Sequence, residues 1–494
     1  MKAFRRSRCR GLSLLGVGAL ALPTLLVSPA SGAPIDLDLS RTYETRFTGA
    51  EDVGGAGDVT GDGRPDVVLT KASADPYGRT NAGAAYVWTG RRRESVSVRQ
   101  TSFEGFRIAG SRQHDNLSSA CVIGDLNGDG RREIVLGAQT ADTPNGDASG
   151  AAYVVFGKAS SGDVDLRDFH DDDQNTRGFR IDGGGTFALA GWRVACLGDV
   201  NADGLDDLAI AAPFAAATYV VFGKSDTNRV DLKLFDLNAQ LQAGFRIDTP
   251  APQYSDLYSV GAAGDTNGDG YEDVVIGVTR DPHDSPGSAY VVYGKTDTLP
   301  VDVATEGNEW GYRIRGERDG YATGTTVSGA GDANGDGLAD VVVGAHRLYR
   351  NLPGRAYVVF GSAGATDVRL ANLSDRGFEI RGGPGRDRAG TALAAAGDVN
   401  GDGLDDVLVG APWAGARGRW AAGVVYVVFG SESSSPVSVR ELEGRGHLIV
   451  GARRGDQIGS SAAAFRERGR ARLLVGSWRS LQVYLVTVRS TGRP

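Results

Sequence analysis

One nine-residue phrase recurs six times along the chain at a nearly constant spacing. The phrase is Asp-x-Asn-x-Asp-Gly-x-x-Asp, and residues 398–406 match it at every fixed position. Its copies are separated by 67, 74, 66, 67 and 66 residues and begin at Asp58, Asp125, Asp199, Asp265, Asp332 and Asp398. A period of this length is typical of repeat architectures, in which each repeat is one supersecondary unit. The sequence therefore predicts an array of similar units.

The oxygen-bearing residues of the phrase are spaced like the ligands of a calcium loop. Calcium prefers about six to eight oxygen ligands, and short loops supply them from alternate positions. The glycine at position 6 permits the sharp turn between ligands because it lacks a Cβ atom. In the last copy the predicted ligands are the side chains of Asp398, Asn400, Asp402 and Asp406 and the main-chain carbonyl of Leu404.

The other five copies predict equivalent ligand sets. They comprise Asp58, Thr60, Asp62, Arg64 and Asp66; Asp125, Asn127, Asp129, Arg131 and Glu133; Asp199, Asn201, Asp203, Leu205 and Asp207; Asp265, Asn267, Asp269, Tyr271 and Asp273; and Asp332, Asn334, Asp336, Leu338 and Asp340. Thr60 replaces the asparagine in the first copy, so we expect that site to be the weakest. For a single copy, turn formation is as good an explanation as a metal site, since Asp, Asn and Gly form turns through local hydrogen bonds. The repetition of the carboxylates favours calcium, with about six ions per chain.

Residues 1–33 have the features of a secretory signal peptide. Five positive residues precede an apolar stretch from Leu12 to Val27, and cleavage after Ala30 and cleavage after Ala33 both remain open. No second apolar stretch is long enough to span a membrane. The sequence therefore predicts a secreted, extracellular protein without a membrane span, whose mature part is residues 34–494.

The acidic balance of the chain has an explanation within the chain itself. The formal net charge is −8, and it becomes −13 when the five positive residues of the signal peptide are removed. Six bound calcium ions would bring the charge of the mature chain from −13 to about −1. The acidity therefore does not require a basic partner. No run of Lys and Arg with interleaved aromatic residues occurs, which argues against a nucleic-acid partner.

Two cysteines follow the signal peptide, and both lie just before a calcium loop in neighbouring repeats. Cys121 and Cys196 occupy the same predicted strand, offset by one residue. An extracellular compartment permits a disulfide between adjacent innermost strands. Two small, unbridged, buried side chains are the alternative, and both interpretations remain open.

Three further phrases recur in each unit and predict strands. A short apolar segment after the loop ends in Gly-Ala, as at Gly137-Ala138 and Gly410-Ala411. A very apolar segment follows at 153–157, 219–223, 290–294, 357–361 and 426–430, and an alternating Gly-Phe-Arg-Ile-like segment comes next. Continuous apolar character indicates a strand buried on both faces, and alternation indicates a half-exposed strand. With the strand that enters the loop, each unit has four strands, which is typical of a β-propeller blade.

The number of predicted blades is seven. Six units carry the loop, and a seventh runs from Asp456 to Tyr484 with residues 465–472 in place of the loop. The seventh unit lacks its fourth strand, which residues 42–49 at the other end of the chain would supply. The predicted fold is thus an all-β, seven-bladed β-propeller of four-stranded antiparallel blades, whose ring is closed by an N-terminal strand in the last blade.

These phrases resemble those of the FG-GAP family, whose best-known member is the seven-bladed N-terminal β-propeller of integrin alpha chains. The resemblance covers essentially residues 34–494. It implies calcium loops on one face, between the first and second strands of the blades, and partner binding on the opposite face. Integrin alpha chains carry such loops in only the later blades, whereas this chain has six copies.

The leading hypothesis for function is a secreted, calcium-binding, monomeric module for adhesion or extracellular recognition. Its ligand would be an extracellular protein or glycan on the face opposite the calcium loops. Arginine-rich loops predicted at that face are residues 75–81, 280–286, 347–355 and 412–419. Arginine with tryptophan suits anionic or sugar ligands. Solvated arginines without a ligand are the alternative.

The second hypothesis is an extracellular propeller enzyme, a hydrolase or lyase of carbohydrate or phospholipid-type substrates. The five histidines share no position in the repeat, and no Gly-x-Ser-x-Gly or His-Glu-x-x-His phrase occurs. The notable carboxylate clusters are already assigned to calcium. We therefore expect no enzymatic activity.

Overall fold

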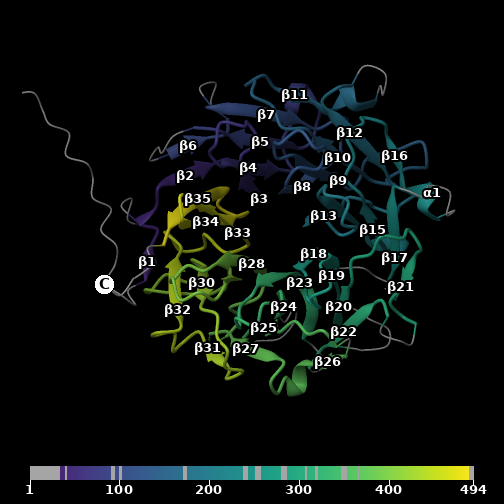
Figure 1. Cartoon of the computed structure of the whole chain (residues 1–494). Coiled ribbons are helices and arrows are strands. Elements are labelled where there is room, and N and C mark those ends of the chain that lie inside the picture. The colour runs from purple at the N-terminus through teal and green to yellow at the C-terminus, as the bar shows by residue number, and fades with distance from the viewer. Residues whose placement is uncertain are drawn as a thin grey trace, which may run out of the picture.

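The structure is a computed structural model. It describes residues 34–38, 42–90, 95–99, 103–170, 175–236, 243–250, 258–279, 286–305, 309–317, 321–346, 353–364, 366–383 and 385–488. The predicted signal peptide and residues 280–285 and 347–352 of the predicted ligand-face loops lie outside these ranges. The described strands form seven sheets arranged as blades around a central axis (Figure 1). The all-β, seven-bladed propeller predicted from the sequence is confirmed.

Four antiparallel strands make up the body of each blade, numbered here from the axis outward. They are β3 (Asp52–Gly57), β4 (Asp66–Lys71), β5 (Ala84–Trp88) and β7 (Gly105–Ala109) in blade 1; β8 (Leu117–Val122), β9 (Ile134–Ala138), β10 (Ala151–Val155) and β12 (Gly178–Asp182) in blade 2; β13 (Arg193–Gly198), β14 (Asp207–Ala212), β15 (Ala217–Val221) and β17 (Gly244–Asp248) in blade 3; and β18 (Tyr258–Gly264), β19 (Asp273–Val278), β20 (Ser288–Val292) and β22 (Gly311–Arg315) in blade 4.

Blades 5 to 7 follow the same order. They comprise β23 (Ala322–Gly331), β24 (Asp340–His346), β25 (Arg355–Val359) and β27 (Gly377–Arg381) in blade 5; β28 (Ala392–Gly397), β29 (Asp406–Ala411), β30 (Val424–Val428) and β32 (Gly446–Val450) in blade 6; and β33 (Ser461–Glu467), β34 (Arg470–Ser477), β35 (Gln482–Thr487) and β2 (Thr45–Thr48) in blade 7. Short helices occur only in connections of the described chain: η2 (Pro76–Gly78), η3 (Leu166–His170), η4 (Pro213–Ala215), α1 (Leu232–Asp236) and η5 (Leu370–Asn372).

A fifth, very short strand lies at the outer edge of each blade and was not predicted. It pairs in parallel with the fourth strand and comes from the connection that belongs to the following blade, as β11 (Val164–Asp165) on β7 shows. In blade order these outer strands are β11 (Val164–Asp165), β16 (Val230–Asp231), β21 (Val301–Asp302), β26 (Val368–Arg369), β31 (Val437–Ser438), β1 (Ile35–Asp36) and β6 (Ser95–Ser97). Each blade is therefore joined to the next by main-chain hydrogen bonds at its rim.

The N-terminal segment closes the ring in two blades. Strand β2 pairs antiparallel with β35, with Phe47 opposite Val483, which confirms the predicted fourth strand of blade 7. Strand β1 adds the outer strand of blade 6, with Ile35 opposite Ile449, which the sequence analysis did not foresee. The Asp36 carboxylate also accepts hydrogen bonds from Arg419 Nη2 at 2.7 Å and Arg417 Nη1 at 2.9 Å. Figure 1 shows β1 and β2 beside the last two blades.

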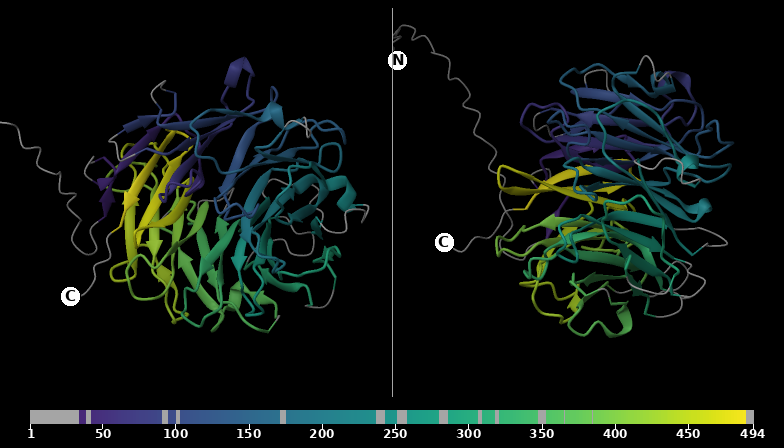
Figure 2. Two further views of the ribbon diagram at one scale, coloured as in Figure 1. Left: turned by 45° about the horizontal axis from the view of Figure 1, so that its top comes forward. Right: turned by 45° about the vertical axis from the view of Figure 1, so that its right-hand side comes forward.

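The hydrophobic core lies between adjacent blades. One cluster joins Val135 and Val154 of blade 2 to Leu208 and Tyr219 of blade 3, all nearly inaccessible to solvent. The second and third strands are covered on both faces by neighbouring blades (Figure 2), which explains their continuous apolar sequences.

A disulfide joins Cys121 of β8 to Cys196 of β13, with 5.9 Å between the Cα atoms. It connects the innermost strands of blades 2 and 3. Both side chains are half-buried. The structure thus favours the bridge over two free, fully buried cysteines.

Candidate metal centres

The predicted metal loops connect the first and second strands of blades 1 to 6, so all of them lie at one face of the ring, here called the loop face. Each loop turns at two residues with left-handed backbone, at positions 4 and 6 of the phrase. In the second loop these are Gly128, with φ 79°, and Gly130, with φ 83°. Position 6 was predicted from the sequence, whereas the requirement at position 4 was missed.

The first carboxylate of each loop organises the turn. Asp125 Oδ1 accepts the amides of Gly128 at 2.6 Å and Asp129 at 3.0 Å, and its Oδ2 accepts the amide of Gly130 at 2.8 Å. In all six loops this carboxylate accepts the amides of positions 5 and 6. These bonds need no metal, because they satisfy the loop amides locally.

The side chains at positions 3 and 5 are held together. In the second to sixth loops the asparagine Nδ2 donates to the aspartate Oδ2, at 3.3 Å between Asn127 and Asp129 and at 2.8 Å between Asn400 and Asp402. The other oxygen of the aspartate accepts the amide of position 7, at 2.9 Å from Arg131. The loop oxygens are therefore positioned before any cation enters.

The carboxylate at position 9 lies at the base of the loop and is buried. Glu133, Asp207, Asp273, Asp340 and Asp406 have no exposed surface, and Asp66 is 2% exposed. Each accepts the amide of position 2, at 2.7 to 3.0 Å. In blades 3 to 6 the second oxygen accepts the amide of the glycine after the third strand, such as Gly223 at 2.7 Å.

Burial shifts the pKa of these carboxyl groups upward. The pKa rises to about 6 for Asp66, to about 7 for Asp207, Asp273, Asp340 and Asp406, and to about 8 for Glu133. Desolvation is the main cause, nearby loop carboxylates add to it, and the amide hydrogen bonds oppose it. A cation in the loop would favour the ionised form and reverse the shift.

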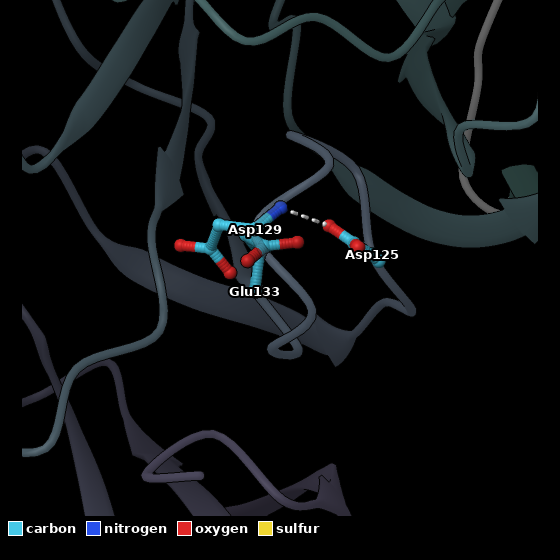
Figure 3. Close-up of side chains that lie close together, drawn as sticks. All are labelled: Asp125, Asp129 and Glu133. Atoms are coloured by element: carbon cyan, nitrogen blue, oxygen red, sulfur yellow. Dashed lines mark hydrogen bonds between the residues drawn. The ribbon is translucent and has the colours of Figure 1, made fainter.

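The second loop brings three carboxylates together. Oxygens of Asp125, Asp129 and Glu133 lie within 4.8 Å of one another (Figure 3), and among the described residues this is the one such acidic group. Glu133 Oε2 accepts the Leu126 amide at 2.7 Å. Its Oε1 is buried without a hydrogen bond of normal geometry, although the Gly157 amide is close enough to lower the pKa slightly. Converging hard oxygens with one unsatisfied oxygen fit a divalent cation such as calcium.

Successive loops are joined around the ring. The amide of position 8 donates to the carbonyl of position 1 in the preceding loop, as from Asp405 to Asp332 at 3.0 Å and from Ala339 to Asp265 at 2.9 Å. In blade 7, Arg466 Nη2 replaces this amide and donates to the Asp398 carbonyl at 3.0 Å. Periodicity alone gave no signal for these contacts.

One serine–histidine pair occurs away from the loops. Ser111 Oγ lies 2.6 Å from His170 Nε2, while Arg180 Nη1 lies 2.5 Å from His170 Nδ1. Burial and nearby arginines lower the pKa of His170 to about 4. Because a guanidinium only donates, Nδ1 accepts, and the neutral ring carries its proton on Nε2 toward Ser111. The imidazole is therefore not placed to remove a proton from this serine, which is itself buried.

Comparison with known proteins identifies the repeat. The family described as "FG-GAP repeat" matches residues 52–88, 117–155, 191–232, 257–293 and 389–428. These matches fall on blades 1, 2, 3, 4 and 6, and each spans the first three strands and the loop between the first two. Blade 5 has the same loop phrase and strand order.

The chain is also similar to integrin alpha chains over part of its length. It is 27% identical over 54% of its residues to integrin alpha pat-2 of Caenorhabditis briggsae, 32% identical over 38% to integrin alpha-PS2 of Drosophila melanogaster, and 33% identical over 38% to integrin alpha-V of Gallus gallus. The aligned regions cover 21%, 12% and 16% of those proteins. The seven-bladed ring thus contains FG-GAP repeats in five of its blades, and the chain resembles integrin alpha chains.

Proposed function

We propose that the chain is a secreted, calcium-binding module for adhesion or extracellular recognition. Its ligand, an extracellular protein or glycan, binds the face opposite the loop face, here called the ligand face. The similarity to integrin alpha chains and the FG-GAP propeller support recognition as the general role. The disulfide supports an oxidising compartment. No helix of the described chain is long and apolar enough to cross a bilayer.

The observation that carries this proposal is the placement of exposed aromatic side chains. Tyr77, Phe214, Trp420 and Trp478 lie between the second and third strands of blades 1, 3, 6 and 7, and Phe187 lies between blades 2 and 3. All five of these connections are at the ligand face, and each aromatic residue is 58 to 63% exposed. Large aromatic residues are enriched among those that contribute most to binding energy at interfaces.

Arginines accompany three aromatic residues at this face. Arg454 lies 5.8 Å from the Trp420 ring centre, Arg79 lies 5.0 Å from that of Tyr77, and Arg388 lies 4.7 Å from that of Trp413. Arg454 is exposed and Arg388 is half-buried, so their guanidinium groups add charge to the apolar contact that the rings offer a protein or glycan, whereas the buried Arg79 is paired with Asp165.

Calcium has a structural role in this proposal. The six loops would bind about six ions with the affinity of extracellular modules, roughly 0.1–1 mM. Bound ions would neutralise the carboxylates and stiffen the loop face, while the ligand face remains free. Equilibrium dialysis measures the stoichiometry, and two or fewer ions per chain would contradict it.

Binding without catalysis is part of the proposal, as is a monomeric state. A screen of the mature, calcium-loaded chain against glycan arrays and extracellular proteins would identify a ligand. The variants Tyr77→Ser and Trp420→Ser should weaken its binding, whereas Leu299→Ser should not. Leu299 follows the third strand of blade 4 on the loop-face side and is 67% exposed, so it is a matched control. Equal binding by all three variants would exclude the ligand face.

A further inference from the structure

Blade 7 differs from the other blades at the loop face. Where blades 1 to 6 carry an acidic loop, β33 and β34 are joined by a tight hairpin at Arg468 and Gly469, with φ 51° and 75°. The segment 465–472 contains four arginines and the single carboxylate of Glu467. This sector of the loop face therefore has the opposite charge from the other six.

The hairpin also leaves space that the other blades fill. Elsewhere the side chain at position 7 of one loop covers position 4 of the preceding loop. Leu404 of the sixth loop would lie 2.7 Å from a Cβ atom added at Gly335 of the fifth. Arg131 of the second loop would likewise lie 2.8 Å from one added at Gly61 of the first. Arg64 occupies position 7 of the first loop. The preceding blade around the ring is blade 7, whose hairpin has no position 4 for the Arg64 side chain to cover. A cavity of about 550 Å³ lies here.

This cavity, which we call the blade-7 cleft, is lined mainly by arginine, small and apolar residues. The lining residues are Ala56, Gly57, Asp58, Gly63, Arg64, Pro65, Arg132, Ala464, Phe465, Arg466, Glu467 and Arg468. The arginines come from three blades, with Arg64 from blade 1, Arg132 from blade 2, and Arg466 and Arg468 from blade 7. Side chains distant in sequence therefore converge on one space.

The arginine charges in the cleft are not neutralised by partners. In the described ranges none of the four lining arginines forms an ion pair, although Arg132 interacts at longer range with Asp206. Both lining carboxylates are engaged, since Asp58 accepts three loop amides at 2.8 to 3.0 Å and Glu467 pairs with Arg472. The cleft therefore carries a net positive charge.

We propose that the blade-7 cleft binds an acidic saccharide through its carboxylate or sulfate groups. Planar guanidinium groups bind such oxyanions in a bidentate manner. The half-buried Phe465 ring and Pro65 supply an apolar wall for a sugar ring. The volume lies within the range of small-ligand sites, which favours a short saccharide over a peptide segment. This site lies on the loop face, apart from the proposed ligand face.

Calorimetric titration of the mature chain in calcium-containing buffer tests the proposal. The probes are a sulfated disaccharide, a uronic-acid disaccharide, a neutral disaccharide and a short aspartate-rich peptide. The variants are Arg64→Leu alone and with Arg468→Asn. Leucine occupies the equivalent position at Leu205, Leu338 and Leu404, and asparagine tolerates left-handed backbone, so both changes suit the fold. Arg131→Leu, at the same position of the second loop but outside the cleft, is the matched control.

We expect saturable binding of at least one acidic disaccharide and none of the neutral one. The double variant should weaken binding about tenfold or more, because two charged contacts are lost. The control should bind within about twofold of the unmodified chain. Absence of binding to both acidic disaccharides, equal binding by the double variant, or preference for the peptide would each overturn the proposal. If the double variant fails to fold, Arg64→Leu alone decides, and an unchanged affinity would overturn it.

Discussion

At the scale of single residues, the loops depend on two left-handed positions, of which the sequence displays one plainly. Glycine occupies position 6 in all six copies, and this requirement is readable from the phrase. Position 4 also has positive φ, but Ala202 in the third loop, with φ 60°, interrupts the run of glycines and conceals the rule. A left-handed conformation costs a non-glycine residue roughly 1–2 kcal/mol.

Replacement of Ala202 by glycine should stabilise the chain. Relief of the left-handed strain outweighs the extra freedom of glycine in the unfolded state, so the free energy of unfolding should rise by roughly 0.5–1 kcal/mol. Urea unfolding in chelator measures this without a contribution from metal. Gly128→Ala is the matched reverse change, because its Cβ would meet Leu205 at an ordinary 3.6 Å, and it should destabilise. An unchanged or lower midpoint for Ala202→Gly would show that the third loop carries no strain.

The Glu133→Gln variant tests the carboxylate cluster of the second loop. Glutamine keeps an oxygen for the Leu126 amide, so the fold should persist, but it cannot supply the negative charge that Glu133 would present to a cation beside Asp125 and Asp129. Calcium prefers carboxylate ligands, and we expect one ion fewer per chain in equilibrium dialysis. The exposed Glu443→Gln should leave the stoichiometry unchanged. If both variants bind as many ions as the unmodified chain, Glu133 is not a ligand.

At the scale of strands, burial explains what the sequence could predict. The second and third strands are enclosed by neighbouring blades, so their apolar runs are long and recognisable. The outer strands were missed because they are two or three residues long and alternation cannot be recognised over so few. A weak signal existed, since Ile35-Asp36-Leu37 repeats the pattern of Val164-Asp165-Leu166 and Val230-Asp231-Leu232.

Deletion of residues 34–49 from the mature chain should destabilise the whole ring. The deletion removes β1 from blade 6 and β2 from blade 7. It also removes Phe47, whose side chain is fully buried in the intact chain. Loss of a buried phenylalanine alone costs about 3–5 kcal/mol. Deletion of residues 34–38 alone, which spares β2, should lower the melting temperature less. Equal melting of the long deletion and the intact chain would show that the ring does not depend on this closure.

At the scale of the whole molecule, the loop face concentrates negative charge that the fold itself only partly offsets. The sequence identified the six loops and their oxygens, but it could not show that one loop alone brings three carboxylates within 4.8 Å. In blades 3 to 6 the ninth-position aspartate accepts one amide on each oxygen, whereas Glu133 is one methylene longer and its Oε1 has no hydrogen bond of normal geometry. These hydrogen bonds depend on how the glycine after the third strand of the same blade meets the carboxylate, which the repeated phrase does not reveal.

Removal of calcium should lower the melting temperature of the mature chain substantially without unfolding it at room temperature. The loop turns retain their internal hydrogen bonds, such as those from Asp58 and Asp125 to loop amides, so the blades persist. Ions that bind only the folded state stabilise it by mass action, by roughly 1 kcal/mol per site when calcium exceeds its Kd several-fold. Differential scanning calorimetry in calcium, in chelator and in magnesium at equal ionic strength separates site binding from screening, because magnesium demands a tighter octahedral site. Identical melting in calcium and chelator would mean that the six loops act only as turns.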